Sequence, residues 1–144
     1  MAVSIIMEVQ FIASLAPIVR DPDAARALYQ DALGLSFEGG EGDYVFTEQL
    51  EGTKHFALWP LVEATKACFG TTEWPEAIPI PQASIEFEVA DVPAAANELK
   101  AAGYQLIHEA RTEPWTQITA RLLSPGGLLV TVCYTPWVHE GSKS

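Results

Sequence analysis

Alternating apolar and polar residues mark several short segments of the chain, and this period of two predicts β-strands. Two other segments, over 22–33 and 92–102, carry alanine and leucine at helical spacing and are each followed by a glycine, Gly34 or Gly103. Glycine closes helices readily because it tolerates the left-handed backbone found just past many helix ends. We therefore expect two helices. The expected strands are 11–19, 35–38, 44–48 and 55–59 in the first half of the chain, and 83–89, 104–108, 117–123 and 128–134 in the second.

One sequence unit occurs twice along the chain. The segment VRDPDAA at 19–25 has a counterpart, VADVPAA, at 89–95, and each lies between an apolar segment and an alanine-rich one. In both copies an aspartate, Asp21 or Asp91, can cap the helix start, and a proline stands in the first turn, where a missing N–H does no harm. The residues expected to be buried on these helices are Ala25, Leu28, Tyr29, Ala95 and Leu99.

The order of elements predicts an α+β fold of two tandem βαβββ modules, over about 10–60 and 83–136. The residues between them, 61–82, contain three prolines, which disfavour regular structure, so we expect a linker there. The tail after Pro136 ends in Gly-Ser-Lys-Ser and is expected to fray. With 144 residues, the chain is expected to form one domain, 1–144, that can fold without a metal ion or a disulfide.

The charge balance narrows the classes of partner. The chain has 8 Lys and Arg against 19 Asp and Glu, a formal net charge of −11. Nucleic acids and anionic membrane surfaces both require clustered basic residues, so we expect neither as a partner. A cationic or neutral small molecule fits this composition better.

The cysteines and the apolar segments bear on the compartment. Cys68 and Cys133 show neither metal-binding nor redox spacing, which suggests a reducing environment. The first residues lack the basic start of a secretory signal, and no apolar run is long enough to cross a bilayer. We therefore expect a cytoplasmic protein.

The doubled unit and its signatures resemble the vicinal oxygen chelate superfamily. This superfamily contains glyoxalase I, extradiol dioxygenases, fosfomycin-resistance enzymes and bleomycin-resistance proteins. The resemblance is carried by VRDPDAA at 19–25 with LGL at 33–35, FEVADV at 87–92, EPW at 113–115 and SPGG at 124–127. It implies two curved half-barrel sheets around a central cavity, and commonly a homodimer.

The resemblance also locates the positions that hold a divalent ion in the metal-using members. They fall on Ser14, Ala57, Ser84 and Thr131, with His55 two residues from Ala57 on the same strand face. Serine and threonine hydroxyls are neutral at pH 7 and replace imidazole or carboxylate poorly around such an ion. The resemblance therefore implies the metal-free branch of the superfamily, with no metal and no other cofactor.

Strand parity predicts which residues face the cavity, because alternate residues of a strand point to opposite sides. On 83–89 this puts Ile85 and Phe87 under the helices and Ser84, Glu86 and Glu88 on the concave side. Aromatic walls with a few polar anchors are typical of small-molecule sites. The residues expected to contact a ligand are Ser14, Phe46, His55, Ala57, Trp59, Ser84, Glu86, Trp115, Gln117, Thr119, Arg121 and Thr131.

Glu86 and Trp115 each allow a structural and a functional interpretation. A carboxylate in the cavity is costly to bury alone, so Glu86 should pair with Arg121 or meet a cationic ligand. Trp115 follows Glu-Pro in a loop that the superfamily places near the cavity mouth. Its indole would then stack on a flat ligand, or else pack on its own domain as a surface residue.

The histidines also leave alternatives open. His55 could be a remnant metal ligand, with Glu86 or Glu88 completing a displaced site, or an ordinary hydrogen-bonded residue. His108 and His139 belong to no motif and are expected at the surface.

Three functions remain open at this point. The first is metal-free binding or sequestration of a small organic molecule, an antibiotic or a metabolite, as in bleomycin-resistance proteins. The second is an enzyme, namely a lyase, isomerase or dioxygenase with a rearranged metal site, or one that uses Glu86 as its catalytic base. The third is a vestigial cavity in a dimerisation or partner-binding module. The sequence does not decide whether the protein is an enzyme.

Overall fold

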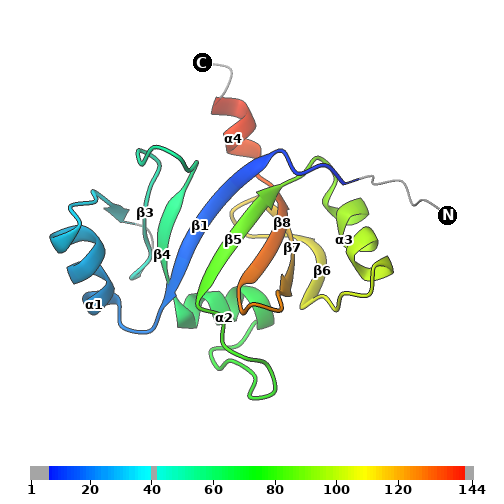
Figure 1. The fold of residues 1–144 in the computed structure, drawn as a ribbon, viewed down its shortest axis with the longest axis horizontal. Helices are drawn as coiled ribbons and strands as arrows, with labels where there is room; N and C mark the ends of the chain where they lie inside the picture. Colours follow the sequence, from blue (N-terminus) through cyan, green and yellow to red (C-terminus); the bar gives the residue numbers. More distant parts are fainter. Residues whose placement is uncertain (1–6, 40–41, 142–144) are drawn as a thin grey trace.

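A computed structural model describes residues 7–39 and 42–141 (Figure 1). The strands of the first module are β1 (Phe11–Val19), β2 (Glu38–Gly39), β3 (Val45–Thr47) and β4 (Phe56–Pro60). Those of the second are β5 (Ala83–Glu88), β6 (His108–Thr112), β7 (Ile118–Leu123) and β8 (Leu129–Tyr134). They form one curved sheet in the order β2-β3-β4-β1-β5-β8-β7-β6. The α+β fold of two βαβββ modules is therefore confirmed.

The two modules meet where β1 pairs with β5 at the centre of the sheet (Figure 1). The pairing is antiparallel, with Ser14 opposite Glu86 and Leu15 opposite Ile85. A register shift between Ile12 and Ser14 marks a bulge in β1. A bulge adds one residue to one strand, so Ile12 and Leu15 share the convex face although they are three residues apart.

The helices begin as the sequence predicts. Helix α1 (Pro22–Arg26) starts after Asp21, whose Oδ1 accepts a hydrogen bond from the Ala24 N–H at 3.1 Å. Helix α3 (Val92–Ala101) starts in the same way after Asp91, with the Ala94 N–H at 3.0 Å. Each such cap contributes roughly 1 kcal/mol to stability.

The first helix departs from prediction after its first turns. It continues as a π-helical segment, η1 (Ala27–Ala32), which widens the turn. Ala25 and Tyr29 pack against the cluster formed by Val45, Phe56 and Leu58. Leu28 was expected to be buried, but 51 % of its surface is exposed. Burial predicted from a spacing of 3.6 residues per turn is wrong for Leu28, because a π-helix has a different number of residues per turn.

Two segments expected to lack regular structure are helical. Helix α2 (Leu61–Phe69) occupies the start of the expected linker, and it buries Ala64, Thr65 and Cys68. The three prolines of the linker all lie beyond this helix, so they do not oppose it. Helix α4 (Pro136–Gly141) occupies the expected frayed tail, whose last residues, 142–144, lie outside the described part of the chain.

Strand β6 begins four residues later than predicted, at His108. This later start results from the way in which α3 ends. Gly103 has φ 100°, and the Tyr104 N–H reaches back to the Leu99 carbonyl at 3.0 Å. The residues directly after the helix therefore complete its C-terminal cap instead of extending as a strand.

The two cores lie at opposite ends of the sheet. One packs α3 on the second module through Val89, Val92, Ala95, Ala96, Ala120 and Val132. The other is the Val45 cluster under α1. Figure 1 shows the convex face of β1 and β5 lying between α1 and α3 without a helix over it, so the expectation that Ile85 and Phe87 pack under the helices is wrong. No helix in the described part of the chain is long and apolar enough to span a membrane.

Candidate functional site

A cavity of about 450 Å³ lies on the concave side of the sheet. Strands β1 and β5 form its floor, and α4, the start of α2 and the loop between β6 and β7 contribute to its walls. The described residues that line it are Ala13, Ser14, Ala16, Tyr44, His55, Trp59, Glu63, Ser84, Glu86, Trp115, Gln117, Thr135, Trp137 and Val138.

Most of the residues predicted to contact a ligand line this cavity. These are Ser14, His55, Trp59, Ser84, Glu86, Trp115 and Gln117. The remaining five, Phe46, Ala57, Thr119, Arg121 and Thr131, are not among its lining. Parity predicts the face of the sheet on which a side chain lies, but it does not predict what covers that side chain. Ligand contact by any of these residues stays a prediction.

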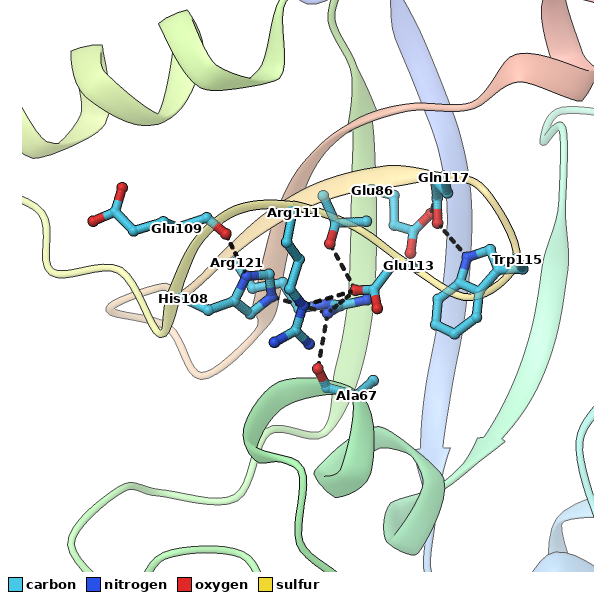
Figure 2. Close-up of polar contacts among 10 residues, drawn as sticks. Ala67, Glu86, His108, Glu109, Arg111, Glu113, Trp115, Gln117 and Arg121 are labelled. Atoms are coloured by element: carbon cyan, nitrogen blue, oxygen red, sulfur yellow. Dashed lines mark hydrogen bonds and ion pairs between the residues drawn. The ribbon is translucent and has the colours of Figure 1, made fainter.

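Arg121 is covered by its own neighbours and is only 1 % exposed. Its Nη1 lies 2.7 Å from Glu113 Oε2 and donates to the Ala67 carbonyl of α2 at 3.3 Å (Figure 2). The Trp59 ring lies over the guanidinium at 5.8 Å. The ion pair between Arg121 and Glu86, one of the two alternatives that the sequence left open for Glu86, is therefore not formed, because Glu113 in the loop after β6 supplies the partner carboxylate.

The groups around Glu113 determine the pKa of its carboxyl group. Burial alone would raise the pKa of the Glu113 carboxyl group. The Arg121 guanidinium, the Thr119 hydroxyl at 2.7 Å and Arg111 together outweigh burial, so this pKa lies below its ordinary value. Glu113 and Arg121 are consequently both charged, and each neutralises the other within the protein.

His108 belongs to the same cluster, contrary to its expected place at the surface. Burial lowers the pKa of its imidazole, and the nearby Arg121 acts in the same direction, although the hydrogen bond to the Glu109 carbonyl acts against them. A neutral ring that donates from Nδ1 to this carbonyl at 2.7 Å can accept at Nε2 from Arg121, 3.0 Å away (Figure 2). His108 thus supports the buried arginine.

Glu86 lines the cavity and lies beside Gln117, as Figure 2 shows. The Gln117 amide donates to Glu86 Oε1 at 3.0 Å and to the Thr135 hydroxyl at 2.9 Å. Its amide oxygen accepts from the Trp115 indole N–H at 2.9 Å. One side chain therefore fixes both the carboxylate and the indole.

Trp115 stands at the cavity mouth, 44 % exposed, on a tight loop. The Thr116 N–H bonds to the Glu113 carbonyl at 2.9 Å, and Thr116 has φ 77°, a left-handed conformation that is uncommon for threonine. These contacts fix the position of the indole. Trp137 of α4 also lines the cavity, although it lies in the tail that was expected to fray.

Helix α4 closes the far end of the concave face over Glu88. The Glu88 carboxylate is fully buried and accepts from the Thr135 N–H at 2.6 Å and from His139 Nε2 at 2.8 Å. His139 was expected at the surface and is instead half-buried against Glu88. Burial, with the carboxylates Glu86 and Glu88, raises the pKa of the neighbouring Cys133 thiol far above its ordinary value. Cys133 therefore stays protonated and is a poor nucleophile.

A second group of polar residues, which parity only partly predicted, lies in the first module. The Tyr44 hydroxyl lies 2.7 Å from His55 Nε2, and His55 Nδ1 lies 3.1 Å from Glu48 Oε2. Phe46 stacks on the imidazole, with ring centres 5.1 Å apart. Tyr44 shares the strand parity of Phe46, so this signal was available in the sequence. Glu63 was missed because α2 was not predicted.

The side chains at the metal positions of the superfamily do not fit a divalent ion. Ala57 has no donor atom, Thr131 is buried outside the cavity lining, and Ser14 and Ser84 offer neutral hydroxyls. Both ring nitrogens of His55 have partners within the protein. Within residues 7–39 and 42–141, no three His, Cys, Asp or Glu side chains gather closely enough to hold a metal ion.

Comparison with known proteins identifies the family. The model of the glyoxalase/bleomycin resistance protein/dioxygenase superfamily matches residues 12–132. The chain belongs to this superfamily. No curated protein matches its sequence significantly.

Solved structures share the fold of this superfamily member at low sequence identity. A superfamily member from Vibrio splendidus has 15 % identity and a TM-score of 0.55, covering 90 % of this chain and 99 % of that one. Methylmalonyl-CoA epimerase from Mycobacterium tuberculosis has 18 % identity and a TM-score of 0.55, covering 96 % and 97 %. A protein from Legionella pneumophila titled NAD-dependent benzaldehyde dehydrogenase has 12 % identity and a TM-score of 0.58, covering 84 % and 96 %. These likenesses show the fold alone.

The Glu113–Arg121 pair predicts a pH dependence of stability. The folded-state pKa of Glu113 lies below its unfolded value, so its stabilisation is complete above the unfolded pKa and is lost as pH falls through the folded one. Replacing Glu113 with Gln should flatten the fall of unfolding free energy on acidification. It should also cost about 3–5 kcal/mol at neutral pH, because Arg121 is left buried without a counter-charge.

Urea unfolding over a series of pH values measures both effects. The matched control is Glu109→Gln, which removes an exposed carboxylate paired with Lys100 and should change the neutral-pH stability by less than about 1 kcal/mol. An acid dependence of Glu113→Gln equal to that of the wild type would contradict this account of the pair.

Proposed function

We propose that the protein binds a small organic molecule with a cationic group and a flat aromatic portion in its concave cavity, without a metal ion. Sequestration of an antibiotic or a metabolite is the role proposed for this binding. The observation that carries the proposal is the charge of the lining. The described residues that line the cavity include two carboxylates, Glu63 and Glu86, but no lysine or arginine.

The sequestered arginine supports this proposal. Arg121 lies on the concave side of the sheet, but it forms an ion pair with Glu113 beneath the Trp59 ring. The described lining of the cavity therefore contains the Glu86 carboxylate but no lysine or arginine, inside a protein of net charge −11. Such a field attracts cations and raises their local concentration at the cavity mouth.

Aromatic walls provide the second part of the recognition. Trp59 of β4, Trp115 of the β6–β7 loop and Trp137 of α4 come from three separate elements, and Tyr44 adds a fourth ring. A cation over an aromatic face gains roughly 0.5–2 kcal/mol, more when water is excluded. Because Gln117 already holds Trp115 beside Glu86, little side-chain freedom is lost on binding.

The compartment and the oligomeric state complete the proposal. The two cysteines are buried and form no disulfide, which supports a reducing compartment, and we propose the cytoplasm.

We further propose a homodimer through the convex face of β1 and β5. Ile12 and Leu15 are 44 % and 39 % exposed there, opposite Phe87 and Ile85. A second copy related by two-fold symmetry would bury this apolar strip against itself.

Tryptophan fluorescence provides the test of the binding site. Titration with N-methylquinolinium should quench the wild type saturably, because the cation enters beside Trp59, Trp115 and Trp137. Trp115→Ala should bind at least severalfold more weakly. The matched control is Trp74→Phe. Trp74 lies outside the cavity lining, donates to the Ile78 carbonyl and packs edge-on against Phe69.

Quenching of Trp74→Phe should saturate at the same concentrations as the wild type. Identical titrations of Trp115→Ala and wild type would remove Trp115 from the site. Quenching that rises linearly without saturation in every protein would contradict binding of this class of ligand.

Sedimentation equilibrium tests the proposed dimer. The wild type should sediment as a dimer, and Ile12→Glu as a monomer, because a charge on the convex strip cannot be buried without a partner. Val62→Glu places the same charge on a valine of α2 that is 51 % exposed and should leave the dimer intact. A monomeric wild type, or a dimeric Ile12→Glu variant, would contradict the proposed interface.

A further inference from the structure

Glu48, His55 and Tyr44 form a continuous chain of hydrogen bonds that ends at the cavity. Glu48 Oε2 lies 3.1 Å from His55 Nδ1, and His55 Nε2 lies 2.7 Å from the Tyr44 hydroxyl. Tyr44 and His55 both line the cavity, whereas Glu48 stands behind them, partly exposed. Phe46 stacks on the imidazole at an interplanar angle of 11°, which holds the ring in the orientation that both hydrogen bonds require.

The positions of the protons follow from the chemistry of the partners. An ionised carboxylate can only accept hydrogen bonds, so His55 Nδ1 must carry the proton that faces Glu48. The other nitrogen of a neutral imidazole is then an acceptor, and Tyr44 donates its O–H to it. The remaining lone pairs of the Tyr44 oxygen are left for a molecule in the cavity.

Tyr44 cannot act as a phenolate in this setting. Burial raises the pKa of its hydroxyl, and the carboxylates of Glu86, Glu48 and Glu63 raise it further. A tyrosine held neutral can still accept a proton if it passes its own proton on at the same time. His55 stands at hydrogen-bonding distance to receive it, and Glu48 stabilises the imidazolium that results.

We propose that this chain is a proton relay that deprotonates a cationic carbon acid, a C–H group next to a positively charged nitrogen. The C–H bond breaks and its electron pair stays on the substrate, which becomes neutral overall. The proton bonds to the Tyr44 oxygen while the original hydroxyl proton of Tyr44 moves to His55 Nε2. Reversal of both transfers restores the protein, and hydrogen exchange at that carbon results when the relay protons exchange with solvent before the reversal.

The charge of the cavity selects the substrate class. Deprotonation of a neutral molecule would create an anion beside Glu63 and Glu86, at a cost in electrostatic energy. Deprotonation of a cation creates no net negative charge there. The inference rests on the proposed function for its ligand class, but it adds a reaction and assigns Tyr44 as the catalytic residue, with Glu48 as a positioning residue.

Deuterium exchange of N-phenacylpyridinium tests the relay, since this flat aromatic cation has methylene protons next to its charged nitrogen. Wild-type protein in D₂O should accelerate loss of the methylene proton NMR signal, and the rate should saturate with probe concentration. Tyr44→Phe should lower the saturated rate by roughly 10²-fold or more, the usual contribution of a positioned acid–base group. Binding, followed by tryptophan quenching, should change little.

Glu48→Gln separates a positioning role from a merely structural one. It should lower the saturated exchange rate while the probe concentration for half-saturation stays that of the wild type, because only the imidazolium loses its stabilising charge. Tyr104→Phe and Glu51→Gln remove the same groups from exposed positions outside the cavity lining and should match the wild type.

Each remaining outcome decides against a specific statement. Saturable binding without accelerated exchange would overturn the relay and leave the proposed function standing. Exchange that survives Tyr44→Phe but is lost in Glu86→Gln would make Glu86 the base instead. Absence of saturable binding would overturn the proposed function, and the relay's substrate class with it. Long-range proton–nitrogen NMR that finds His55 protonated at Nε2 and bare at Nδ1 would overturn the relay without any ligand.

Discussion

The antiparallel pairing of β1 with β5 joins the two modules and builds the floor of the cavity. Ser14 lies opposite Glu86 and Ala16 opposite Ser84, so small side chains and one carboxylate face the concave side together. The bulge before Ser14 directs Ile12 to the convex face, next to Phe87. Without this bulge the floor would receive an isoleucine, and the open volume of about 450 Å³ would shrink.

The distribution of charge follows from what covers that floor. The second module has an arginine, Arg121, on the concave side, but its Nη1 is bound to Glu113, to His108 and to the Ala67 carbonyl of α2. The Trp59 ring then turns its face to the guanidinium and lines the cavity as well. One buried ion pair therefore leaves the lining acidic and aromatic, and the proposed selectivity for cations depends on it.

Local signals in the sequence were sufficient for the modules and for much of the site. Asp21 and Asp91 cap their helices, and β1 has the predicted bounds, because caps and alternation act within a few residues. Strand parity likewise predicted that Glu86 and Gln117 share the concave side. The predictions that failed concern features that depend on contacts between distant segments. Glu113, for example, is paired with Arg121 only because the loop after β6 folds over β7.

Helices α2 and α4 illustrate the same limit. Each is short and lies in a segment whose nearby prolines or polar tail suggested irregular structure. Packing on the concave face stabilises them, and they bring Glu63, Trp137 and Val138 to the cavity. The relay residue Tyr44 shares the parity of Phe46, so its side of the strand was predictable, whereas its distance to His55 was not.

The charge preference of the cavity is the most direct test of this account. Dissociation constants for N-methylquinolinium, neutral quinoline and a naphthalenesulfonate, compared at neutral pH and low ionic strength, isolate the contribution of charge on similar flat rings. The account predicts that the cation binds at least roughly tenfold tighter than quinoline, a difference of about 1.4 kcal/mol. It also predicts that Glu86→Gln narrows this ratio and that the anion does not bind measurably. Equal affinities for the three compounds, or a preference for the anion, would contradict it.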